Sequence, residues 1–393
     1  MRVSSNTLRQ VFLNALEMAQ RQIVETQTQV STGLRINQPS DDPIDAARIR
    51  ELEASLSRLD QYQANGVIAR NRLSLEEEAL VGVVEHLQRV RELAVQGNNA
   101  TQGLESRRAI AAELGERLDG LLSLANSADS AGRYLFSGFA ENTQPFARSG
   151  GSVVYNGDQG QRSLQVSDGR FIAVNDPGSE LFQRIPNGNG TFALAAAPAN
   201  TGEGVLGAGT VTDPAAYVAD TYTITFLTPA NYEVRDSGGG LVVAATYADG
   251  DTIGFLGTEI QLDGQPAAGD VFTSTPSTSQ DVFTTVQNLI TALESGADDT
   301  LVQNNVGQTL QDIDQALGRA IEVRTDVGGR LGSLDGEAGL NEGFTVQLTE
   351  TLSEIRDLDY AEAISRLSQQ LVGLEAAQQT FARVQGLSLF RFL

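Results

Sequence analysis

Apolar residues recur at alternating spacings of three and four at both ends of the chain. Near the N-terminus this series is Phe12, Leu16, Ala19, Ile23, Thr26 and Val30. Near the C-terminus it is Ile364, Leu367, Leu371, Leu374, Gln378 and Phe381. A 3/4 alternation sustained over several turns is typical of helices that pack along a coiled-coil seam. The pattern therefore predicts paired long helices at the two ends.

Proline placement indicates how far the helices extend. No proline lies between Ile44 and Gln144 or after Pro276, and a proline inside a helix costs about 3 kcal/mol. Six glycines between Gly328 and Gly343 weaken the prediction that the carboxyl helix is continuous there. The expected helices span approximately residues 5–33, 43–97, 104–131, 300–358 and 359–385.

Two of these helices have readable starts. In Ser40-Asp41-Asp42-Pro43, Asp42 can cap the helix and Pro43 can take its first position. Asp359 followed by Glu362 has the form of a capping box, with Asp in the role of Ser or Thr.

The middle of the chain has the alternation of β-strands. Residues 221–226 alternate strictly, and residues 232–243 predict a hairpin around Gly238-Gly239-Gly240. Further strands are expected at 153–155 and 170–174, and a loop from Ala193 to Ala216. The predicted fold class is α+β multidomain: paired long terminal helices forming a coiled-coil bundle, with an inserted β-rich domain.

This organisation predicts three domains, each of the first two built from both ends of the chain. They are a terminal helical domain of residues 1–42 plus 359–393, a helical bundle with a β-hairpin of residues 43–149 plus 281–358, and a β-rich surface domain of residues 150–280.

Composition excludes several classes of function. The 393 residues contain no cysteine, one histidine, 27 basic and 50 acidic residues, and the formal net charge is −23. These numbers exclude disulfide scaffolds, thiolate metal sites and clustered histidine ligands, and they argue against nucleic-acid binding. We expect neither a membrane span nor a secretory signal peptide, because no run approaches 18 apolar residues and no apolar segment precedes a cleavage site.

Candidate chemical sites have simpler structural explanations. His86 is expected to be a half-exposed helix residue, and the cluster of Asp41, Asp42 and Asp45 lacks the spacing of a calcium loop. The runs Glu76–Glu78 and Asp298–Asp299 are expected to be solvated or to cap helices. We predict no catalytic, metal or cofactor site and no enzymatic activity.

Apolar residues instead continue to both termini, which predicts an assembly interface along the terminal helices. Its expected residues are Leu8, Phe12, Leu16, Ile23, Val30, Ile364, Leu367, Leu371, Leu374, Phe381, Leu387, Leu389 and Phe390.

Several motifs resemble the flagellin superfamily over nearly the whole chain. Residues 31–43, STGLRINQPSDDP, resemble the turn after that family's first helix. Residues 133–139 (RYLFSGF), 143–146 (TQPF), 155–162 (YNGDQGQR) and 276–283 (PSTSQDVF), with the ending GLSLF at 386–390, are similar to the hook-associated class at the hook–filament junction.

The resemblance implies a structural subunit of the extracellular flagellum that links the hook to the flagellin filament. It implies partners as well: further copies in a helical ring, a companion hook-associated protein, flagellin, and a cytoplasmic export chaperone. Export would follow the flagellar type III route.

Two alternatives remain open at this point. A filament subunit would share the helical arms, although the motifs at 133–139 and 143–146 favour the junction class. A secreted enzyme with flagellin-like arms would need a catalytic insert, for which the sequence offers no clustered polar site.

Overall fold

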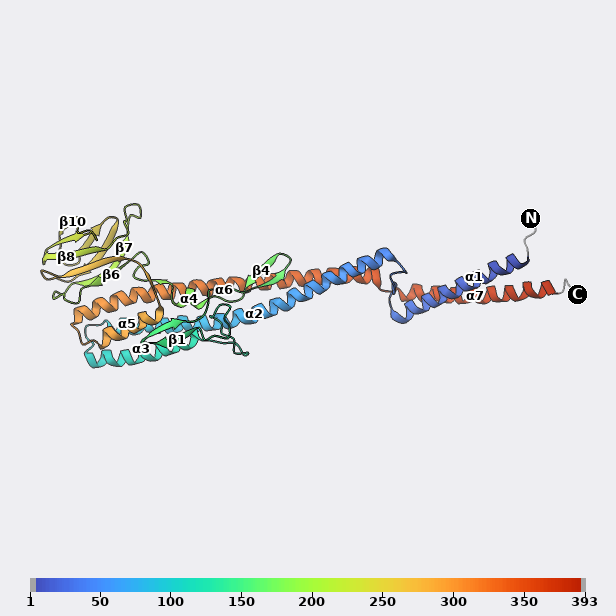
Figure 1. Ribbon diagram of the computed structural model, residues 1–393, viewed down its shortest axis with the longest axis horizontal. Coiled ribbons are helices and arrows are strands. Elements are labelled where there is room, and N and C mark those ends of the chain that lie inside the picture. The colour runs from blue at the N-terminus through green and yellow to red at the C-terminus, as the bar shows by residue number, and fades with distance from the viewer. Residues whose placement is uncertain (1–4, 390–393) are drawn as a thin grey trace. The chain divides into compact units, whose positions relative to one another are not determined.

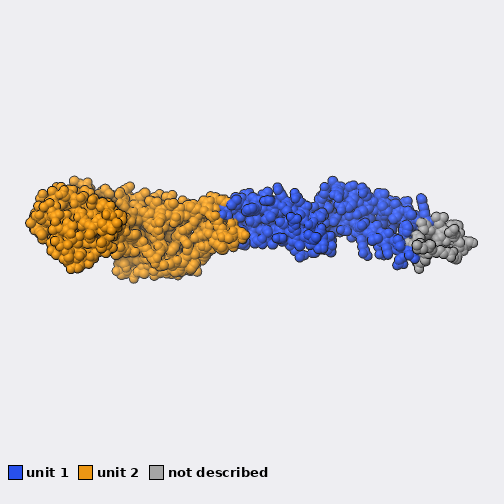
Figure 2. Space-filling view, turned by 90° about the horizontal axis from the view of Figure 1, so that it is seen from above, with its two compact units in different colours: residues 1–64, 337–393 blue, residues 65–336 orange. Residues whose placement is uncertain are grey.

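The computed structural model describes residues 5–389, and the chain forms two compact units (Figure 2). The terminal unit consists of Met1–Ala64 and Glu337–Leu393, and the central unit is Asn65–Gly336. Both boundaries fall inside long helices, so two helices contribute to both units.

Helices account for both ends of the chain. They are α1 Ser5–Thr32, α2 Pro43–Gly97, α3 Leu104–Ala125, α4 Gly178–Phe182, α5 Val282–Glu294, α6 Asp299–Arg356 and α7 Tyr360–Leu389 (Figure 1).

Strands occupy the middle of the chain. They are β1 Phe146–Ser149, β2 Ser152–Tyr155, β3 Ser163–Ser167, β4 Arg170–Ala173, β5 Ile185–Pro186, β6 Phe192–Ala196, β7 Val205–Val211, β8 Tyr222–Thr228, β9 Asn231–Arg235, β10 Leu241–Thr246, β11 Thr252–Phe255, β12 Thr258–Asp263, β13 Val271–Pro276 and β14 Ser279–Gln280. The predicted α+β fold, with long terminal helices and a β-rich insertion, is confirmed.

The glycines of α6 do not interrupt it, and α6 continues for 58 residues. A Cβ atom placed on any of the six glycines from Gly328 to Gly343 would meet nothing within 4 Å. These glycines therefore face open space. Each lowers helix stability by about 1 kcal/mol relative to alanine, and packing of the opposite side of the helix offsets this loss.

One predicted helix end is wrong, because α3 stops at Ala125 rather than near Ala131. The Asn126 side-chain oxygen accepts the N–H of Phe146 at 2.9 Å, and its amide donates to the carbonyl of Phe146 at 2.9 Å. Asn126 thus ties the helix end to β1, and this long-range pairing competes with continuation of the helix.

Residues 192–276 form two sheets with a shared core. One sheet has the strand order β10-β9-β8-β13-β6 and the other β11-β12-β7. The buried core between them includes Phe192, Ile224, Phe226 and Phe272. The loop predicted from Ala193 to Ala216 is wrong, because β6 pairs with β13 and β7 pairs with β12 within that segment.

This sheet pair is fixed to α6 by buried polar contacts. The carboxylate of Asp312 accepts the N–H of Gly188 at 2.6 Å, and the side chain of Asn304 accepts the N–H of Leu206 at 2.8 Å. Asn304 also donates to the carbonyl of Gly204 at 3.0 Å. The region is therefore a docked domain, not a free insertion.

The main core lies in the central unit, where α2, α3, α5 and α6 bury leucine and valine side chains between them. A small separate cluster in the terminal unit contains Ile36, Ala46, Ile49 and Leu352. No helix in residues 5–389 combines the length and apolar character that crossing a membrane requires.

Candidate assembly interface on the terminal helices

Helices α1 and α7 lie side by side in the terminal unit (Figure 1). The side chains of α1 that turn away from solvent are half-buried, except for Thr26 and Gln29, which are buried. The rings of Phe12 and Phe381 meet across the pair, with centroids 5.7 Å apart. The line on α1 consists of Phe12, Leu16, Ala19, Ile23, Thr26 and Val30.

The matching line on α7 differs from the predicted series at alternate positions. Ala363 is fully buried, and the remaining members are half-buried. This line consists of Ala363, Leu367, Gln370, Leu374, Ala377 and Phe381. It includes three predicted seam residues, and it excludes Ile364 and Leu371, which are 52% and 50% exposed.

Ile364 and Leu371 belong instead to a second face of α7. Tyr360, Ile364 and Leu371 are spaced by four and seven residues, which places them on one side of a helix. All three are exposed. We call these three residues the α7 stripe.

Helix α1 also carries apolar residues outside its line. Val11 and Met18, seven residues apart and therefore on one flank, are 62% and 59% exposed. Val24 is exposed as well, on the opposite flank. The pair of helices thus buries one apolar line on each helix and leaves further apolar residues in water.

Four of the predicted interface residues lie outside the part of the chain whose side chains are described. They are Leu8, Leu387, Leu389 and Phe390.

The turn between α1 and α2 meets the turn between α6 and α7, and we call this meeting point the joint (residues 33–36 and 355–358). The N–H of Arg35 donates to the carbonyl of Arg356 at 2.7 Å, and the N–H of Leu358 donates to the carbonyl of Gly33 at 3.0 Å. The guanidinium of Arg35 donates from Nε and Nη2 to the carbonyl of Ile355, at 3.0 and 2.7 Å. A cation at the last carbonyls of α6 is well placed with respect to its dipole.

The predicted caps lie beside the joint. The carboxylate of Asp42 accepts the N–H groups of Ile44 and Asp45, both at 3.1 Å, and α2 begins at Pro43. Likewise Asp359 accepts the N–H groups of Ala361 and Glu362, at 2.9 and 3.2 Å. These bonds satisfy N–H groups that a helix start leaves without partners.

The other acidic residues of these motifs form ion pairs or close a turn. The carboxylate of Glu362 accepts from Arg366 at 3.2 Å, one helical turn further along. Asp45 pairs with Arg35 at 2.6 Å. Asp41 accepts the N–H groups of Asn37 and Gln38, at 3.0 and 2.9 Å. The acidic cluster is therefore committed to caps, a turn and an ion pair.

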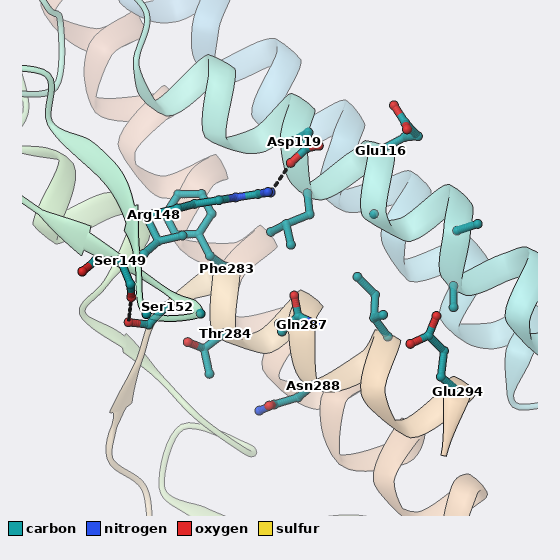
Figure 3. A pocket seen from close by; sticks show the side chains of 18 residues that line it. Glu116, Asp119, Arg148, Ser149, Ser152, Phe283, Thr284, Gln287, Asn288 and Glu294 are labelled. Atoms are coloured by element: carbon teal, nitrogen blue, oxygen red, sulfur yellow. Dashed lines mark hydrogen bonds and ion pairs between the residues drawn. The ribbon is translucent and has the colours of Figure 1, made fainter. Parts of the chain in front are cut away.

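A groove of about 860 Å³ lies between α3, the β1–β2 turn and α5 (Figure 3). Arg148 forms an ion pair with Asp119 on one wall, and the opposite wall carries Thr284, Gln287 and Asn288. The groove is open, and apolar side chains such as Phe283 and Ile290 line it together with polar ones. Within residues 5–389, no three His, Cys, Asp or Glu side chains form a group able to hold a metal ion.

His86 is half-buried, and its ring lies against Gly120 of α3, where a Cβ atom would be 2.3 Å from the ring. Gly120 therefore leaves the space that the imidazole occupies between α2 and α3. The position has a packing explanation.

One acidic residue is placed differently from the prediction. Glu76 was expected to be solvated, but its side chain is buried in the central unit. Burial and the neighbouring carboxylate of Asp176 raise the pKa of Glu76 to about 8. The heptad pattern could have located it, because Leu73, Glu76, Leu80 and Val83 continue the 3/4 spacing of the buried face of α2.

The chain is similar to flagellar proteins along its whole length. Residues 3–141 match the bacterial flagellin N-terminal helical region. The flagellar hook-associated protein 3 of Escherichia coli is 24% identical over 391 residues, which cover 100% of this chain and 99% of that protein.

Solved structures of flagellar proteins show the same similarity. The FlgL structure from Xanthomonas campestris is 37% identical, with a TM-score of 0.72 over 77% of this chain and 99% of its own. The flagellar junction protein FlgL from Legionella pneumophila is 34% identical, with a TM-score of 0.73 over 79% and 100%. By contrast, a Salmonella phase 2 flagellin matches 53% of this chain and 42% of its own length, at 28% identity.

Proposed function

The chain belongs to the flagellar hook-associated protein 3 (FlgL) family, and we propose that α1 and α7 are the surface through which its copies join at the hook–filament junction. The family is structural, its location is the extracellular flagellum, and the partial match to flagellins makes the filament-subunit alternative the weaker one. The observation that carries the proposal is the set of apolar side chains on α1 and α7 that the chain itself leaves exposed.

Part of the apolar area of α1 and α7 can be covered only by another chain. Burying a fully exposed Leu, Ile or Met side chain gains about 1.5–3 kcal/mol, so a half-exposed one retains about half of that gain. Ile364, Leu371, Val11 and Met18 together leave several kcal/mol to be gained by association. A ring multiplies this gain by its number of contacts.

The placement of these residues favours a ring or helix over a closed dimer. The α7 stripe lies on one helix, and Val11 and Met18 lie on the other. A contact that joins one of these patches to the other on a neighbouring copy uses two different surfaces of the chain. Such heterologous contacts generate rings or helical arrays.

We further propose the finer partners and the export route that the family implies. A companion hook-associated protein would bind on the hook side and flagellin on the filament side. A cytoplasmic chaperone would hold the carboxyl helix before export through the flagellar type III system. The exposed apolar residues of α1 and α7 support a chaperone that covers them before assembly. The net charge of −23 would keep unassembled subunits apart.

We propose no catalytic role. The carboxylates that first suggested chemistry, Asp41, Asp42 and Asp45, are engaged by backbone N–H groups and by Arg35. The proposed role is geometric: helices that bind copies, and a docked β-rich domain that they carry.

Leu371→Asp tests the proposal. Because Leu371 is half-exposed, an aspartate there stays hydrated in the free chain, but a carboxylate buried without a partner costs several kcal/mol at each contact. Expressed in a strain that lacks its own copy, the variant should be secreted, leave the cells non-motile and let flagellin escape into the medium.

The matched control is Gln369→Asp, which adds the same charge two residues away at an exposed polar position. It should restore motility at least in part. Full motility with Leu371→Asp, with the protein detected in the flagella by immunoblotting, would contradict the proposed interface.

A further inference from the structure

The buried carboxyl group of Glu76 has an incomplete set of partners. It projects from α2, and its side chain is 1% exposed. Its Oε1 accepts the backbone N–H of Asp176 at 3.0 Å, whereas its Oε2, also buried, has no hydrogen-bond partner in the structure. A buried ionised carboxylate with one oxygen unsatisfied is unfavourable.

The cations around Glu76 are already committed to other carboxylates. Arg330 of α6 donates from both Nη atoms to the carboxylate of Asp176, at 2.8 and 2.9 Å. Arg72, one turn before Glu76 on α2, pairs with Glu141 at 2.6 Å. Glu141 is also 3.1 Å from Arg162.

Asp176 is held on all sides. Besides the two bonds from Arg330, its carboxylate accepts from Gln161 at 2.8 Å, while its backbone N–H is the donor to Glu76. This residue lies beside Glu76 on the segment between β4 and α4. The charged groups around Glu76 are thus Asp176 from that segment, Arg330 from α6 and Arg72 from α2, with Asp326 behind Arg330.

We propose that Glu76, Asp176 and Arg330 form a proton-dependent fastener between α2 and α6. With a proton on Glu76, the segment at 174–178 rests on α2 through the Asp176 N–H and on α6 through the Asp176 carboxylate. Loss of the proton places two carboxylates side by side in a buried site, and the segment separates from α2. The fastener lies within the central unit and does not depend on the proposed assembly surface.

The direction of the pH effect follows from the pKa of Glu76. Burial first, and then Asp176, raise this pKa from 4.5 to about 8, against the opposing effects of the Asp176 N–H, Arg330 and Arg72. The folded chain therefore keeps a proton that the unfolded chain releases above pH 4.5. The stability that this proton confers is complete below pH 4.5 and is lost as the pH rises toward 8.

Unfolding equilibria measured against pH in wild type and in Glu76→Gln test this. Glutamine has the shape of the protonated side chain and cannot ionise. Relative to the variant, the wild-type unfolding constant should rise by up to about tenfold per pH unit, or roughly 50-fold from pH 6 to pH 8, because Glu76 of the folded chain is itself half deprotonated at pH 8. Glu78→Gln, at an exposed position on the same helix, is the control and should follow wild type. Parallel curves for wild type and Glu76→Gln would overturn the proposal.

A second measurement needs no variant. The carboxyl carbon of Glu76, followed by NMR in the wild-type chain, should titrate near pH 8, and the protection of the Asp176 amide against hydrogen exchange should fall over the same range. A titration completed below pH 6, or protection of this amide unchanged up to pH 9, would refute the fastener even if Glu76→Gln failed to fold.

Discussion

The pair α1–α7 and the pair α3–α5 are built from similar apolar patterns and are buried to different degrees. In α3 and α5, Leu114, Leu121, Leu289 and Leu293 have no exposed surface. They belong to a core that α2 and α6 complete. Helix α1 packs against α7, and most of its line, including Phe12, Leu16 and Ile23, is only half-buried.

This difference teaches that 3/4 spacing identifies the face a helix will bury, but not which molecule covers it. The number of neighbouring helices within the chain decides whether the chain itself covers that face. In the central unit four helices of one chain surround the seam. In the terminal unit α1 and α7 pack on each other, and apolar residues beside the seam remain exposed.

The largest expected effect contrasts matched leucines in the two pairs. In the isolated chain, Leu121→Ala should destabilise the central unit by about 2–5 kcal/mol, because it opens a cavity in a fully packed core. Leu374→Ala, on the half-buried line of α7, should cost no more than about 1 kcal/mol.

Chemical denaturation followed by circular dichroism would measure both changes. In flagella the variant with the larger effect should be the other one. Leu374→Ala should impair assembly, while Leu121→Ala chains that fold should still be incorporated into the flagellum. Equal destabilisation of the isolated chain by the two variants would show that the terminal pair is packed as fully as the core.

A smaller effect is expected at the joint. Arg35→Ala removes two hydrogen bonds to the carbonyl of Ile355, for an expected loss of about 1–2 kcal/mol in local stability. The amide of Leu358, which donates to Gly33 across the joint, should exchange faster by hydrogen-exchange mass spectrometry or NMR.

Two further variants sharpen this prediction. Arg48→Ala removes an exposed arginine of α2 and should leave that amide unchanged. Arg35→Lys should fall between wild type and Arg35→Ala, because an ammonium group cannot reproduce the forked contact of a guanidinium. Unchanged exchange in Arg35→Ala would mean that the backbone bonds alone hold the joint.

Much of the helical architecture was predictable because local signals mark it. Pro43 and the Asp42 cap fix the start of α2, and Asp359 marks the start of α7. Intrachain burial on α7 was not predictable to the residue. Gln370 and Leu371 are neighbours on adjoining faces, and only packing against α1 selects the glutamine for the inner line.

Other errors came from contacts that are distant in sequence. The segment 193–216 has the composition of a loop, yet its pairing with β13 and β12 makes it two strands. The short apolar run Phe192-Ala193-Leu194, all of it buried, was the available signal. Glu76 was misplaced because a run of three glutamates indicates a solvated face, although its heptad position pointed inward.

Association should cover the α7 stripe, and the absence of cysteine from the chain allows this to be measured directly. Leu371→Cys provides a single thiol on the stripe, and Leu227→Cys provides one at an exposed position of the β-rich domain. Both should react readily with a water-soluble maleimide in the isolated chain. In purified hook–filament assemblies, Leu371→Cys should become resistant while Leu227→Cys still reacts. Equal reactivity of Leu371→Cys in the free and assembled states, in flagella that contain the protein, would contradict the account.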